Sequence, residues 1–193
     1  MRIELLNAND IVNVVGISEI HNSNNLTQEE LLDIAKSMSN DSLTVQLMNG
    51  LLIADDAHLL SAAQNAVNAQ SGKYMLSRTL DVEIIVYASA QRQIGRALDE
   101  LGVYDSVENV AVVVIGNDRK SVEQSLEKIT TKVGKELSNP FEGSKERFDR
   151  IKTHFDIDEK EICTFTDSDD DLERQKALSK CVVSRVSLVA IDT

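Results

Sequence analysis

The sequence of 193 residues contains no tryptophan, four phenylalanines and three tyrosines. A protein that grips single-stranded nucleic acid along a row of stacking aromatic residues is therefore not expected. Basic residues are also scarce, because 20 lysines and arginines stand against 32 aspartates and glutamates, for a net charge of −12. Since no positive field surrounds the whole protein, contact with nucleic acid or an anionic membrane would need a local basic patch.

There are only two cysteines, Cys163 and Cys181, and one proline. The cysteines lack CxxC spacing and the three histidines lie in separate segments, so we expect reduced thiols and no metal site. The apolar runs are far shorter than the roughly 20 residues of a membrane span. The first ten residues show no apolar signal core. Together these absences predict a cytoplasmic protein with neither a membrane nor a metal as partner.

What is present indicates one α+β domain over residues 1–193, in which about five helices pack on a small mixed or antiparallel sheet. The hydrophobic content of 42 % is enough for a core. Alternation and β-branched runs predict strands at 11–18, 43–48, 110–116 and 184–191. Apolar residues at helical spacing predict helices at 27–38, 56–69, 91–101, 121–137 and 147–155, and a last helix after the acidic run 167–171.

The start of the first helix is marked by Thr27 and Glu30, which have the spacing of a capping box. Residues 80–88 (LDVEIIVYA) are ambiguous. Their β-branched side chains favour a strand slightly, whereas their position directly before a helical segment favours a helix. Glu83, an acid within this apolar run, is expected to pair with Arg92 or His58.

No motif of an enzyme is present: GxGxxG, the P-loop, HExxH and GxSxG are all missing. The acidic run 167–171 (DSDDD) lacks the glycine and terminal glutamate of a calcium loop, and it fits the first turn of a helix better. Residues 138–170 match no recognisable pattern and are interpreted as a possible insertion. An unrecognised small-molecule enzyme with an α+β core remains the alternative function.

One stretch differs from the rest in charge. Between residues 71 and 97, four bases stand against the two acids Asp81 and Glu83, a local excess of positive charge in an acidic chain. Such a patch could contact phosphates, although a solvated surface is the simpler interpretation. Its bases are Lys73, Arg78, Arg92 and Arg96.

The segment around this patch resembles a known family. DDAHLLSAAQNAV is followed by a basic turn and then by EIIVYASAQRQIGRALDELGV. The His58-Leu59 pair, the run Glu83 to Tyr87, the Arg92-Gln93-Ile94 triplet and Gly102-Val103 resemble the small accessory subunit of KEOPS, the PRPK-binding-protein family of archaea and eukaryotes. The resemblance covers about 55–115, with a looser fit at the closing SLVAI. It departs where the family often has a glycine and this chain has Ala90-Gln91.

The resemblance implies a non-catalytic, archaeal subunit of the complex that forms N6-threonylcarbamoyladenosine in tRNA. Such a subunit binds and stimulates the Bud-type atypical kinase/ATPase subunit and holds the 3′ CCA end of tRNA. It needs no cofactor. The resemblance also implies that residues 81–101 are helical.

Candidate site residues follow from the resemblance together with the charge pattern. For tRNA the candidates are Lys73, Arg78, Arg92, Arg96, Tyr74 and His58. Ile94, Leu98 and Leu101 lie at helical spacing on one face. That face and part of the C-terminal helix would meet the kinase, so the candidates for this contact are Ile94, Leu98, Leu101 and Leu172.

Overall fold

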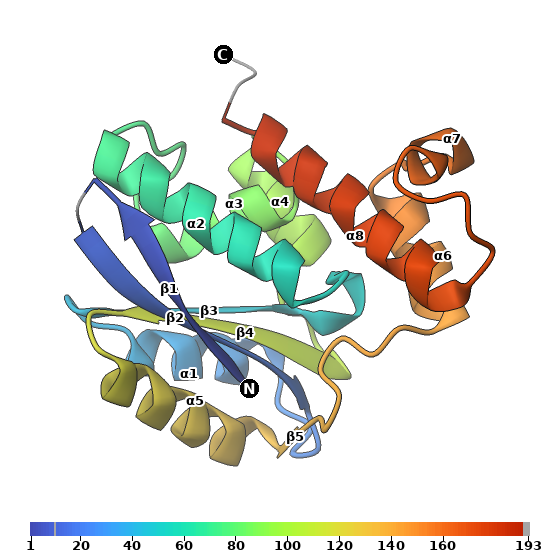
Figure 1. Cartoon of the computed structure of the whole chain (residues 1–193). Coiled ribbons are helices and arrows are strands. Elements are labelled where there is room, and N and C mark those ends of the chain that lie inside the picture. Colours follow the sequence, from blue (N-terminus) through green and yellow to red (C-terminus); the bar gives the residue numbers. More distant parts are fainter. Residues whose placement is uncertain (10, 191–193) are drawn as a thin grey trace.

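The computed structural model describes residues 1–9 and 11–190. Its centre is an antiparallel sheet with the strand order β1-β2-β4-β3, and the short β5 pairs with the end of β2 (Figure 1). The strands are β1 (Arg2–Ala8), β2 (Ile11–His21), β3 (Leu43–Asn49), β4 (Asn109–Gly116) and β5 (Lys135–Glu136). The helices are α1 (Gln28–Met38), α2 (Asp56–Gly72), α3 (Leu80–Ala88), α4 (Ile94–Leu101), α5 (Arg119–Val133), α6 (Lys145–His154), α7 (Glu159–Cys163) and α8 (Asp171–Leu188), with a 3₁₀ turn, η1 (Gly50–Leu52), after β3.

The sheet is covered on both faces. Helices α1 and α5 lie on one face, and α2, α3 and α8 lie on the other (Figure 1). Successive residues of β4 enter the two cores in turn, so that Val112 packs with the first group of helices and Val113 with the second. Because both faces are buried, β4 is apolar at nearly every position instead of alternating. The expected single α+β fold with an antiparallel sheet is confirmed.

Several expected elements are confirmed, among them the strands at 43–48 and 110–116 and the helix at 56–69. The capping box of α1 is present, since Thr27 accepts from the amide of Glu30 and the Glu30 carboxylate accepts from the amide of Thr27. The helix expected at 147–155 is also present, as α6, whereas strands β1 and β5 and the short helix α7 were not expected. The helix expected at 121–137 ends at Val133, where Gly134 adopts a φ of 156° and the chain enters β5.

The strand predicted at 184–191 is wrong as far as the described residues reach. This segment continues α8 to Leu188, and residue 191 lies outside the described part of the chain. Val182, Val186 and Val189 follow helical spacing and are buried in the same core as α2 and α3. Burial along one helical face therefore overrides the strand preference of the β-branched side chains.

Residues 80–88 form the helix α3, as the resemblance implies. After its acidic first turn this helix is buried on all sides and carries apolar or aromatic residues from Ile84 to Ala88, because α2, α8 and the sheet surround it. Residues 81–101 are not one helix, however. Ala90, with a φ of 53°, stands in a turn that separates α3 from α4.

Helices α6 and α7, within the segment first interpreted as an insertion, lie at one end of the molecule beside the start of α8 (Figure 1). A buried ion pair fixes this segment to the sheet: Arg147 of α6 donates to the Glu19 carboxylate on β2 and to the carbonyl oxygen of Gly50. The amide of Phe141 donates to the other oxygen of Glu19. The segment is thus anchored to the core.

His58 joins the start of α2 to the end of α3. Its Nδ1 accepts from the amide of Ala54 at 3.2 Å, and its Nε2 donates to the carbonyl oxygen of Ala88 at 2.7 Å. The ring is fully buried, and burial lowers the pKa of His58 to about 4. The imidazole is therefore neutral at pH 7, and both of its nitrogens are used inside the fold.

This histidine should make the protein acid-sensitive. Below pH 6.5 the unfolded chain binds a proton at this position while the folded chain resists it down to about pH 4, so stability is lost as the pH falls through that window. The expected loss is about 3 kcal/mol of unfolding free energy. Urea unfolding of the wild type and His58→Gln from pH 7 to 4 measures it, because other titrating groups cancel in the difference. Parallel curves for the two proteins would contradict this assignment.

Candidate functional site

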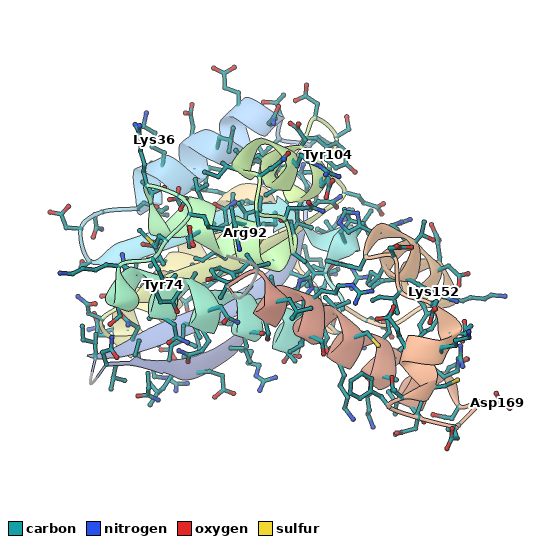
Figure 2. The ribbon with its side chains drawn as sticks, turned by 90° about the horizontal axis from the view of Figure 1, so that it is seen from above. Lys36, Tyr74, Arg92, Tyr104, Lys152 and Asp169 are labelled. Atoms are coloured by element: carbon teal, nitrogen blue, oxygen red, sulfur yellow. The ribbon has the colours of Figure 1, made fainter. Side chains whose placement is uncertain are left out.

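A cavity of about 380 Å³ opens where three segments meet: the loop between α2 and α3, the C-terminal end of α3 with the turn after it, and the end of α8. Figure 2 shows Tyr74 and Arg92 on the face seen from above, which is the side of α2, α3 and α8. The cavity therefore combines aromatic, aliphatic and cationic groups from distant parts of the sequence. Its lining residues are Tyr74, Leu76, Tyr87, Arg92, Val189 and Ala190.

The loop at 73–79 forms one wall of this cavity and carries exposed side chains. It begins at Lys73, which ends α2 in the left-handed conformation with a φ of 61°. Tyr74 and Leu76 are 50 % and 37 % exposed, and Arg78 is also exposed. In the described part of the chain neither Lys73 nor Arg78 takes part in a salt bridge. Both cations are therefore available to a negatively charged partner.

The loop is held from beneath by Glu83. One carboxylate oxygen accepts from the amide of Leu76 at 3.0 Å and the other from the amide of Ser77 at 2.7 Å. Glu83 is fully buried. The prediction that it pairs with Arg92 or His58 is wrong, because its two oxygens serve backbone amides of the loop instead.

The two tyrosines of the cavity differ in environment. Tyr87 is almost completely buried, and burial raises its pKa to about 12, with the negative charge of Glu83 as a further cause. Tyr74, at the rim, keeps half of its surface exposed. A buried phenol thus lines the wall, and an exposed ring stands at the entrance where a planar group could stack on it.

The remaining two bases of the patch are engaged within the protein. Arg92 Nη1 donates to the carbonyl oxygen of Val189 at 2.9 Å, which places its charge at the C-terminal end of α8, where the helix dipole favours a cation. Arg96 lies on α4 and its Nη2 is 3.4 Å from the carboxylate of Glu100. The structure therefore brings Lys73, Arg78 and Arg92 around or beside the cavity, whereas Arg96 belongs to another helix.

Two candidate residues have no surface for a partner in this structure. His58 and Leu101 are both fully buried. The family resemblance suggested His58, and helical spacing with Ile94 and Leu98 suggested Leu101. Helical spacing alone does not distinguish a face that meets the protein's own core from one that meets a partner. Neither residue can therefore belong to a surface that meets a partner in this structure.

The apolar candidates for a protein partner are split between two places. Leu98 on α4 is 44 % exposed, and Tyr104, which follows α4, is 45 % exposed. Ile94 is only partly buried and packs against the core. Leu172 is 58 % exposed, but it lies at the start of α8, about 25 Å along the helix from Val189 at roughly 1.5 Å of rise per residue. Figure 2 shows Tyr104, which follows α4, far from Asp169, which precedes α8, so the exposed surfaces around Leu98 and Leu172 do not form one compact patch.

The described residues give little support to a metal site or to a membrane-spanning helix. No group of three or more histidine, cysteine, aspartate or glutamate side chains there is arranged to hold a metal ion. None of the helices in 1–9 and 11–190 has the length and apolar character needed to cross a membrane. In the acidic run 167–171, Asp170 caps α8 by accepting from the amide of Glu173, so the interpretation as a helix start is confirmed.

The sequence approach missed some of the lining residues. Leu76, Val189 and Ala190 carry no distinctive chemistry, and only the fold brings them to Tyr74. Comparison with protein families shows that a family model described as "Kinase binding protein CGI-121" matches residues 17–190. The matched range includes the loop at 73–79, α4 and α8, and so covers both the cavity and the exposed face of α4.

Proposed function

The chain belongs to the CGI-121 family of kinase-binding proteins, so it is a non-catalytic accessory subunit of the KEOPS type that binds a Bud-type kinase, and we propose that it also holds the single-stranded 3′ CCA end of a tRNA in the cavity beside Tyr74. This family membership removes the alternative of a small-molecule enzyme. The single observation that supports the RNA proposal most is the cavity, in which an exposed tyrosine and an arginine stand beside an unpaired basic loop.

The chemistry of the cavity suits an RNA end. Single-stranded RNA is recognised by stacking of splayed bases and by contacts to their edges, and Tyr74 and Arg92 offer a ring face and a planar cation. Lys73 and Arg78 stand on the adjoining loop, where they could neutralise phosphates. The cavity is small for a ligand site, which favours one or a few unpaired nucleotides over a duplex.

The charge of the whole chain limits the affinity of this contact. A net charge of −12 repels the rest of a tRNA, so the isolated protein should bind RNA weakly. Attachment of the kinase would add a second set of contacts to the same RNA and strengthen the complex by linking the two. The proposed role is therefore that of a clamp on the RNA end within a larger assembly.

For the kinase we propose a contact centred on the exposed face of α4. Leu98 and Tyr104 present apolar and aromatic surface there without being needed in the core. A few well-packed residues near the centre of an interface, tyrosine among the most frequent, supply most of its binding energy. The start of α8 with Leu172 is a separate exposed surface and the other place where the kinase could bind.

Reversing the loop charges tests the RNA proposal. Lys73→Glu and Arg78→Glu should each weaken binding of a tRNA that ends in CCA by about fivefold to tenfold at low salt, and each should lower the salt slope by about 0.7. Fluorescence anisotropy at two salt concentrations, with tRNA that carries or lacks CCA, measures both effects. Lys128→Glu on α5, across the sheet, is the matched charge reversal and should change little. Equal binding of both tRNAs by the wild type would refute the proposal.

A further inference from the structure

We propose that Glu83 is a positioning residue, which holds the loop at 73–79 in the conformation that accepts a single-stranded RNA end. This inference rests on the proposed RNA function of the same cavity. Glu83 does not line the cavity, and it acts through the backbone of Leu76 and Ser77. The loop it holds carries Tyr74 and the two available cations.

The Glu83 carboxylate accepts hydrogen bonds from the backbone of the loop and not from a charged side chain. Its carboxylate receives both amide hydrogens of Leu76 and Ser77, and the side chain of Ser77 donates in turn to the carbonyl oxygen of Thr79 at 2.7 Å. The amide of Glu83 donates to the same carbonyl oxygen at 3.0 Å. Glu83 thus closes a ring of hydrogen bonds between the first turn of α3 and the loop.

A buried carboxylate here is unexpected if stability alone determined the residue. Burial of a charge is costly, and it is tolerated when hydrogen bonds satisfy the carboxylate. Two backbone amides and the N-terminal end of α3 provide that satisfaction. Outside this ring the loop is attached at its start, where the amide of Tyr74 donates to the carbonyl oxygen of Ala69 and Met75 packs against the core. The part that carries Leu76 and Arg78 therefore depends on Glu83.

Electrostatics and positioning predict opposite effects of removing this charge. A negative charge beneath a basic loop repels phosphates, so its removal would tighten RNA binding if charge were all that mattered. A glutamine retains one acceptor oxygen, but its NH₂ group meets an amide that also needs an acceptor. The loop would then lose one of its two anchors, and RNA binding would weaken although the net charge had become more favourable.

The test compares Glu83→Gln with Asp81→Asn, which removes a partly exposed charge from the same helical turn. Affinity is measured by anisotropy with a short single-stranded RNA that ends in CCA, and loop order by amide hydrogen exchange. We expect Glu83→Gln to bind about tenfold more weakly and its Leu76 and Ser77 amides to exchange at least tenfold faster. Asp81→Asn should bind as tightly as the wild type or slightly more tightly, with unchanged exchange in the loop.

The outcomes separate this inference from the RNA proposal. If the folded Glu83→Gln protein binds RNA as tightly as the wild type, or exchanges at the wild-type rate, the positioning role is overturned. If the wild type does not prefer RNA with CCA, the RNA proposal fails, and rapid exchange of the two amides in Glu83→Gln would then identify a purely structural anchor. Should that variant not fold, Ser77→Pro and Ser77→Ala replace it. Ser77→Pro removes the backbone N–H that donates to Glu83 and must weaken RNA binding. Ser77→Ala keeps this backbone N–H and should bind RNA more tightly than Ser77→Pro.

Discussion

Replacing Arg147 with methionine is expected to lower the free energy of unfolding by about 3–5 kcal/mol, because the change leaves the Glu19 carboxylate buried without its cation. Glu19 is fully buried and the Arg147 side chain is only 9 % exposed. Arg147 also donates to the carbonyl oxygen of Gly50, so the same change removes the anchor of α6 to the turn after β3. Urea unfolding measures the loss.

A double variant shows whether Arg147→Met loses stability because the buried Glu19 carboxylate has no cation or because the Arg147 side chain no longer packs. Glu19→Gln combined with Arg147→Met removes both charges and keeps an oxygen that can accept from the amide of Phe141. Most of the lost stability should return, since paired removal of a buried ion pair is often nearly neutral. Arg150→Met is the matched control, because Arg150 pairs with exposed Glu146 and should cost less than about 1 kcal/mol. A single Arg147→Met variant as stable as this control would show that α6 does not depend on the pair.

Replacing Leu98 with glutamate is expected to weaken binding of the kinase about 100-fold, which is the effect of a central interface residue. Leu98 is 44 % exposed, so a charge at this position can be solvated in the free chain and the fold should survive. Isothermal titration calorimetry with the purified kinase subunit measures the affinity, and circular dichroism checks the fold. Ile94→Glu is a poorer choice, since Ile94 packs against the core and its loss could unfold the domain.

Leu172→Glu is the companion variant for this experiment. It introduces the same charge on an exposed leucine at the far end of α8. Normal kinase binding by Leu172→Glu together with loss of binding by Leu98→Glu places the interface on α4. The reverse result would move the interface to the start of α8, beside α6, and would remove α4 from the account.

Local chemistry made parts of the fold predictable. The capping box at Thr27 and Glu30, the strand at 43–48 and the buried run of β4 each rest on interactions within a few residues or on one plain pattern. The end of α8 was mistaken for a strand because β-branched valines suit both structures, and only the surrounding helices decide between them. Segment 138–170 was interpreted as a possible insertion, although its helix at 147–155 was predicted, because the ion pair that anchors it joins Arg147 to Glu19, which lie far apart in the sequence.

The site was predictable only in part for the same reason. Charge and family resemblance directed attention to Tyr74 and Arg92, which line one cavity, and to Lys73, which directly precedes Tyr74. The role of Glu83 could not be read from side-chain pairs, because both of its partners are backbone amides of a loop. His58 illustrates the opposite error, since a histidine beside a family motif can serve the interior alone.

The most direct test of the account is sedimentation of the kinase subunit, with and without this chain, in the presence of tRNA that carries or lacks its CCA end. If the chain joins the kinase to the RNA end, the pair should form a ternary species with the complete tRNA, and removal of CCA should abolish the gain that the chain provides. A chain that binds the kinase but retains both tRNAs equally, or whose binding to the kinase displaces the complete tRNA, would contradict the account.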